Sequence, residues 1–199
     1  MFPDVLIRHW RSIGFVLLLL WFSYIQGMSA LAMILFASAL HEMGHAFAVW
    51  WFGVRVSSLS FSLAGAQMRT ESWRLSYFQE CMAVLAGPLV NLLAGGVFGA
   101  FSDAFPWCTA LAGANWVLGL FNLLPAAPLD GWRMLHLLLN WWLGPVTGSR
   151  VAAVCGGIFA ILLAVGLLLL VMVSGGNLWL LPASAASGIT GVKMLHGER

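Results

Sequence analysis

The composition of this 199-residue chain excludes most classes of soluble protein, because 61% of its residues are hydrophobic and only 8% are charged. Soluble domains usually carry about 25% charged residues, so we expect lipid to surround most of this chain. The net charge of +2 is too small to suggest nucleic-acid binding.

Six apolar segments predict membrane-spanning helices, each of which needs roughly 20 mostly apolar residues. They lie near residues 13–25, 29–52, 75–101, 110–124, 151–173 and 177–194. The polar remainder is too short for a second domain. We therefore predict an all-α polytopic membrane protein with about six transmembrane helices, forming a single membrane-embedded domain over residues 1–199.

The basic residues are spaced along the chain in a way that predicts its orientation. Lys and Arg cluster near residues 8–11, 55–74, 133–150 and 193–199, whereas the segments around residues 26, 103 and 175 contain none. Cytoplasmic loops carry the excess of basic residues, so we expect both termini to be cytoplasmic.

Between the second and third spans, serine alternates with leucine or phenylalanine over residues 58–63. A period of two residues predicts a short β-strand or hairpin, and a solvated loop is the alternative. Strand backbone at a membrane must be paired or lie in a wet cavity. We therefore expect this segment near a water-filled site at the cytoplasmic face.

The second span contains His-Glu-Met-Gly-His at residues 41–45. His41 and His45 are four residues apart, so both imidazoles project from one face of the helix. Glu42 lies about 100° round the helix from His41, where it is better placed to act as a general base than as a third ligand. Two histidine ligands and a glutamate in this spacing are typical of metalloproteases.

Catalytic zinc usually has three protein ligands, and Glu80 and Asp130 are the candidates for the third. Asp130 follows a span that Pro125 and Pro128 should break. Broken backbone at membrane depth must be buried in protein or line a cavity, so the chain can turn this carboxylate toward the histidines. We prefer Asp130, although an Asp-Gly pair is also a common turn.

Ionisable residues within an apolar span need a partner that offsets the cost of placing them there. At the centre of the span this cost is roughly 2.5–3.5 kcal/mol for each residue. A bound divalent cation is a suitable partner for the His, Glu and Asp cluster. A polar contact between helices and a proton relay in a transporter are the alternatives.

Two further segments add to the histidine motif. Ala-Gly-Pro-Leu-Val-Asn occupies residues 86–91, and Asn-Leu-Leu-Pro-Ala-Ala-Pro-Leu-Asp-Gly occupies residues 122–131. In this order the three segments resemble the site-2 protease family of intramembrane zinc metalloproteases. The likeness is greatest to the compact bacterial branch that includes the stage IV sporulation protein FB type.

The resemblance implies one Zn²⁺ ion per chain, a three-helix catalytic core within about residues 29–140, and regulated intramembrane proteolysis of membrane-spanning or membrane-associated protein substrates. It implies His41, His45 and Asp130 as metal ligands and Glu42 as the catalytic acid/base. Asn122 matches an asparagine that helps to bind substrate or the oxyanion in the family, although an interhelical hydrogen bond would account for it almost equally well. The setting implied is a bacterial cell membrane, with the active site near the cytoplasmic side.

Some features depart from the family pattern. Trp132 stands where the family commonly has a second glycine, and it would be strained by about 1–2 kcal/mol if the backbone there required a positive φ. We expect neither the PDZ domain nor the nucleotide-sensing domain of some branches. Asn91 is expected to be structural.

Two other functions would use the same residues. A membrane metal-ion transporter could carry ions through the His, Glu and Asp cluster. A non-catalytic relative could bind and retain membrane proteins, although the presence of Glu42 argues against a silent enzyme.

Overall fold

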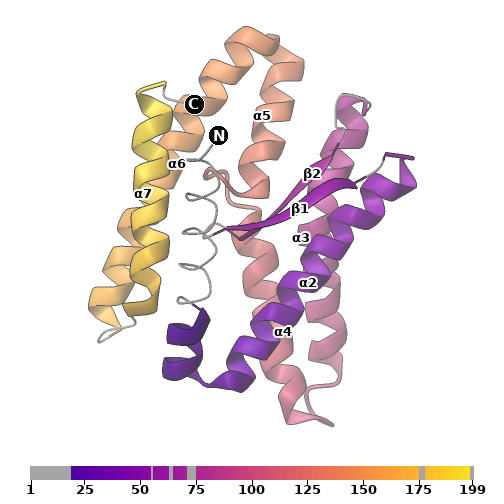
Figure 1. Ribbon diagram of the computed structural model, residues 1–199, viewed down its shortest axis with the longest axis vertical. Coiled ribbons are helices and arrows are strands. Elements are labelled where there is room, and N and C mark those ends of the chain that lie inside the picture. The colour runs from indigo at the N-terminus through magenta and orange to yellow at the C-terminus, as the bar shows by residue number, and fades with distance from the viewer. Residues whose placement is uncertain (1–18, 55, 63–64, 71–74, 175–177, 198–199) are drawn as a thin grey trace, which may run out of the picture.

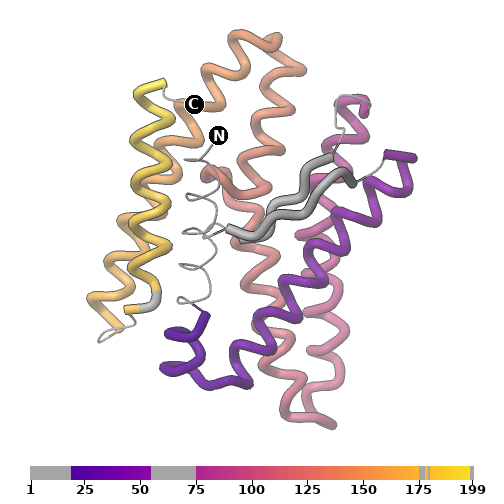
Figure 2. Tube along the Cα trace, viewed as in Figure 1, coloured from indigo at the N-terminus to yellow at the C-terminus, as the bar shows by residue number. Residues whose placement is uncertain are grey.

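The computed structural model describes residues 19–54, 56–62, 65–70, 75–174 and 178–197 (Figure 1, Figure 2). A helix over residues 19–26 precedes the main elements. The others are α2 (Met28–Trp51), β1 (Val56–Ser62), β2 (Gly65–Thr70), α3 (Tyr77–Ala100), α4 (Pro106–Asn122), α5 (Asp130–Leu143), α6 (Pro145–Val173), the 3-10 helix η2 (Leu178–Leu180) and α7 (Leu181–Leu195).

The helices form two groups joined by α5. Helices α2, α3 and α4 pack against one another, and α6 pairs with α7. Helix α5 packs against both α3 and α6, and it connects the two groups in Figure 1. The first residue of α5, Asp130, is thereby held beside the three-helix group.

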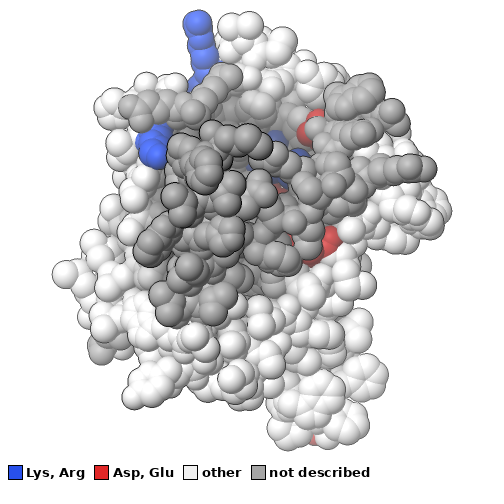
Figure 3. All heavy atoms as spheres, viewed as in Figure 1, with Lys and Arg blue, Asp and Glu red and all other residues white. Residues whose placement is uncertain are grey.

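Helices α2, α3 and α6 are long and apolar enough to cross a membrane, with 24, 24 and 29 residues. Many of their large apolar side chains point outward, for example Leu93, which is 70% exposed, and Met172, which is 73% exposed. Outward apolar surface on this scale, on helices long enough to span a bilayer, is typical of a protein surrounded by lipid. The space-filling view agrees, since charged atoms are few on the described part of the face in Figure 3. The chain is therefore an integral membrane protein.

The count of about six transmembrane helices stays a prediction. Among the described residues, α4 has 17 residues and α7 has 15, which is shorter than the roughly 20 that a perpendicular span needs. Residues 13–18 of the predicted first span lie outside the described residues.

The segment of alternating serines contains β1 and β2, which pair antiparallel in a two-stranded sheet. Leu59 lies opposite Met68, and Phe61 lies opposite Ala66. Both strands contact α2, the helix that carries the histidine motif.

Helix α5 was not among the predicted elements. Helix α4 ends at Asn122, and the chain then runs through the two-proline segment before α5 begins at Asp130. Gly131 makes this connection possible, because a Cβ atom there would collide with the carbonyl oxygen of Leu123. The glycine lets the first turn of α5 lie directly against the end of α4.

The backbone at Trp132 does not have the positive φ that would have strained this residue. This residue lies in the first turn of α5, and no described non-glycine residue has a positive φ. The Trp132 ring packs where a Cβ atom on Gly156 would otherwise lie, and its Nε1 donates a hydrogen bond to the carbonyl oxygen of Ala152 at 3.1 Å. The bulky residue therefore fastens α5 to α6.

Candidate metal centre

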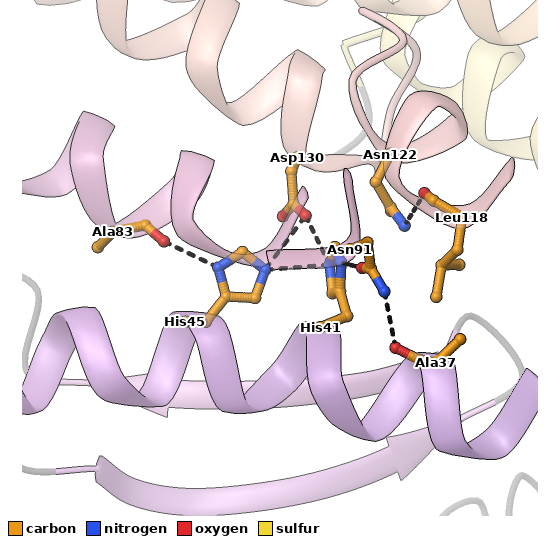
Figure 4. A network of polar contacts seen from close by, with 8 residues as sticks. All are labelled: Ala37, His41, His45, Ala83, Asn91, Leu118, Asn122 and Asp130. Carbon is orange, nitrogen blue, oxygen red and sulfur yellow. Dashed lines mark hydrogen bonds and ion pairs between the residues drawn. The ribbon is translucent and has the colours of Figure 1, made fainter. Parts of the chain in front are cut away.

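Side chains from α2 and α5 converge on one point (Figure 4). Oδ2 of Asp130 lies 2.9 Å from Nε2 of His41 and 3.2 Å from Nε2 of His45. The two Nε2 atoms are 3.1 Å apart. The structure thus brings the three predicted ligands together, and both histidines are buried.

The local structure accounts for this convergence. The histidines are one helical turn apart, so their rings lie one above the other with centroids 4.7 Å apart and planes nearly perpendicular. Asp130 reaches them from the opposite side because it is the first residue of α5. A carboxylate is also favoured at this end of a helix, where backbone N–H groups are unpaired.

The donor atoms fit a metal ion. Nδ1 of His45 lies 2.8 Å from the carbonyl oxygen of Ala83, which can only accept, so Nδ1 carries the hydrogen and Nε2 presents a lone pair. This lone pair faces two further potential ligand atoms, on His41 and Asp130. Two imidazole nitrogens and one carboxylate oxygen suit zinc and leave a fourth position open, as in catalytic zinc sites.

Close packing of α2 on α3 fixes the position of the histidines. A Cβ atom on Gly87 would collide with the ring of His45, and one on Gly44 would lie 2.7 Å from the carbonyl oxygen of Ala86. Only glycine allows the two backbones to approach this closely. The Ala-Gly-Pro segment of α3 therefore forms one wall of the site.

Glu42 lies beside the cluster and is half-buried. Its carboxylate interacts electrostatically with both histidines and with Asp130. No described hydrogen bond ties it to another side chain, which suits a group that must exchange a proton. The predicted base is thus next to the candidate ligands and outside the ligand set.

Glu80, the other candidate for the third ligand, takes a different position. Its Oε1 atom lies 3.9 Å from Nη2 of Arg133, in a partly exposed ion pair between α3 and α5. Among the described residues, the group that could hold a metal contains Asp130 and not Glu80.

Asn122 is near the site, but no hydrogen bond among the described residues joins it to the cluster (Figure 4). Its Nδ2 donates to the carbonyl oxygen of Leu118 at 3.0 Å, within α4 (Figure 4). The half-buried amide uses one of its two hydrogens in this bond.

Two buried asparagines were not predicted as part of the site. Oδ1 of Asn91 lies 2.7 Å from Nδ1 of His41, and Nδ2 of Asn91 donates to Oδ1 of Asn115 at 2.8 Å. Asn91 was expected only to be structural, and no role was predicted for Asn115. A polar residue inside an apolar span is costly unless it is satisfied, and that signal could have linked both to the histidines.

Comparison with known proteins gives consistent relatives, although no protein-family model matches the chain. A zinc metalloprotease of Methanocaldococcus jannaschii is 33% identical over 150 residues, which cover 70% of this chain and 43% of that protein. The predicted zinc metalloprotease Rip3 of Mycobacterium tuberculosis is 29% identical over 170 residues, covering 79% of this chain and 43% of its own length.

A solved structure shares the fold. The site-2 protease from Methanocaldococcus jannaschii matches with a TM-score of 0.70 at 25% identity, covering 94% of this chain and 87% of that chain. The chain spans less than half the length of the two curated relatives described above.

Proposed function

Because this chain belongs to the site-2 protease family of intramembrane metalloproteases, we propose that it is a zinc-dependent endopeptidase that cleaves membrane-spanning or membrane-associated proteins. One observation chiefly supports the proposal. The potential ligand atoms of His41, His45 and Asp130 lie within 4.8 Å of one another, and Glu42 lies beside them. Residues 1–199 would act as one catalytic domain. Assignment to the compact bacterial branch, and to a bacterial cell membrane, remains a prediction.

In the proposed mechanism, His41, His45 and Asp130 would hold the metal. A bound zinc ion would supply Lewis acidity, which polarises the scissile carbonyl and activates water as the nucleophile. Glu42 would take a proton from the attacking water on its carboxylate and deliver it to the nitrogen of the leaving amine. The second amide hydrogen of Asn122 would bind a carbonyl oxygen of the substrate.

We place the site near the cytoplasmic side, with both termini in the cytoplasm. Arg133 lies one helical turn after Asp130, and its ion pair with Glu80 holds it near the start of α3. Basic residues concentrate on the cytoplasmic side of membrane proteins. In Figure 3 the visible basic atoms also gather toward one end of the molecule. Water would reach the site from that side.

A substrate helix must unwind before one of its peptide bonds can be attacked. We propose that the unwound, extended part of the substrate binds to the β1–β2 sheet. A two-stranded sheet leaves an unpaired edge on each strand, and an extended peptide can add to such an edge through backbone hydrogen bonds. Proline at Leu59 or at Phe61 removes a backbone donor from β1. We expect either variant to cleave substrate more slowly and to keep its zinc, as measured by cleavage rate and metal content. Unchanged turnover in both would contradict this use of the sheet.

Metal removal tests the proposed activity. Comparative membrane proteomics of cells carrying the wild type or Glu42→Gln should identify substrates as membrane proteins that accumulate in the variant. In proteoliposomes that contain one such protein, a zinc chelator should stop cleavage, and added zinc should restore it. Cleavage that continues in metal-free protein would rule out a zinc peptidase.

The same proteoliposomes distinguish the transporter alternative. A transporter would move metal ions across the bilayer, and this flux would persist in Glu42→Gln if the glutamate were not part of the pathway. The proposed peptidase should show no flux above that of empty vesicles.

A further inference from the structure

Asn91 is entirely buried between the helices of the three-helix group. It lies on α3, and its side chain contacts α2 on one side and α4 on the other. Nδ2 donates to the carbonyl oxygen of Ala37 on α2 at 2.9 Å and to Oδ1 of Asn115 on α4 at 2.8 Å. Both hydrogens of the Asn91 amide group are thus used by acceptors.

The orientation of Asn115 is fixed in the same way. This side chain is also 0% exposed, and its Nδ2 donates to the carbonyl oxygen of Leu111 at 2.8 Å. Exchanging its amide oxygen and nitrogen would turn Oδ1 toward that carbonyl oxygen and leave two acceptors in contact. Leu111 therefore determines that Asn115 presents its oxygen to Asn91.

The same reasoning then fixes Asn91. If its amide were reversed, Oδ1 would face the carbonyl oxygen of Ala37 and Oδ1 of Asn115, which would produce two unfavourable oxygen–oxygen contacts between buried groups. The observed orientation instead places Oδ1 2.7 Å from Nδ1 of His41 (Figure 4). An amide oxygen only accepts, so Nδ1 of His41 must carry the hydrogen.

We infer that Asn91 and Asn115 form an amide relay that holds His41 in the tautomer able to bind metal through Nε2. This chain of hydrogen bonds runs from the backbone carbonyl of Leu111 on α4 through Asn91 on α3 to His41 on α2. The inference rests on the proposed function only where it assigns zinc to Nε2 of His41. His45 needs no such relay, because the carbonyl oxygen of Ala83 fixes its Nδ1 directly. Both asparagines are positioning residues, and neither is assigned a contact with substrate or metal.

Hydrogen-bond partners of ligating histidines affect metal affinity. Groups that hydrogen-bond the second nitrogen of a ligating histidine orient the ring and set its tautomer, and their loss typically lowers metal affinity about 10–100-fold. Asn91→Leu should lower zinc affinity by this amount. Asn115→Leu should lower it less, because Ala37 still restrains Asn91. In the double variant, Asn115→Leu should add nothing further, since the relay is already broken at Asn91.

The tautomer itself can be measured by nuclear magnetic resonance of the full chain labelled with ¹⁵N-histidine, because nitrogens with and without hydrogen have well-separated shifts. The His41 signals are assigned by their loss in His41→Gln. In metal-free wild type, Nδ1 of His41 should carry hydrogen. In Asn91→Leu, His41 should gain a population with hydrogen on Nε2 instead, while His45 is unchanged and serves as an internal control.

Asn122→Leu is the matched control for zinc affinity alone, because the hydrogen bond of its amide among the described residues lies within α4. This variant should bind zinc as the wild type does. An unchanged His41 tautomer together with unchanged zinc affinity in Asn91→Leu would overturn the relay. Failure of the wild type to bind zinc would contradict the proposed function alone, since the tautomer of the metal-free protein would still decide the inference.

Discussion

Replacing Glu42 with glutamine is expected to reduce cleavage about 10²–10⁴-fold, the contribution usual for a general acid/base. The zinc content should remain one ion per chain. Glutamine has nearly the same shape as glutamate but cannot take a proton from the attacking water. The three candidate ligands do not include Glu42, so metal binding should survive. Cleavage rate and metal content of the purified variant check both statements.

Glu80→Gln is the matched control for this experiment. It makes the same substitution on the neighbouring helix α3, at a residue that the structure pairs with Arg133. A partly exposed ion pair contributes only about 0–1 kcal/mol, so cleavage should stay near the wild-type rate. Full activity of Glu42→Gln would show that Glu42 is not the catalytic acid/base. Loss of zinc from this variant would indicate that Glu42 binds the metal.

Replacing Gly87 with alanine should have an effect of similar size for a different reason. The added methyl group would collide with the ring of His45, including the Nε2 atom that faces Asp130. The ring must then move away from the point where the ligands meet. A misplacement of about 1 Å can cost about 10²-fold in rate. We expect at least this loss of cleavage, together with a zinc content below one ion per chain.

Gly96→Ala separates this local collision from a general effect of alanine in α3. Both glycines lie in the same helix, but a Cβ atom on Gly96 would meet no atom of the described residues within 4 Å. This variant should keep its zinc and its activity, and alanine should favour the helix by up to about 1 kcal/mol. Normal zinc content and cleavage in Gly87→Ala would show that the close approach of α3 to His45 is unimportant.

The three candidate ligands could be predicted from the sequence because the signals for them lie between residues that are close together in the chain. His41 and His45 share a helix face by spacing alone. Asp130 could be preferred over Glu80 because prolines precede it, and the structure places it against the histidines. Its role as a ligand stays a prediction until metal is measured.

Other features depend on contacts between distant segments, and spacing does not reveal them. Helix α5 begins at the predicted ligand itself, but it has 14 residues, and the sequence was divided into spans of roughly 20 apolar residues. A helix of this length falls outside that criterion. The condition for strain at Trp132, a positive φ, is not met, because the residue lies within that helix and packs against Gly156. The partners of Asn91 and Asn115 become visible only when three helices are placed together.

X-ray absorption at the zinc edge of the purified wild-type chain would show directly whether two histidines bind one zinc ion. We expect one zinc ion with two imidazole ligands at about 2.0–2.1 Å, oxygen in the remaining positions and no sulfur. In this arrangement His41, His45 and Asp130 all bind the same ion. A spectrum with fewer than two imidazoles, or with a sulfur ligand near about 2.3 Å, would contradict it.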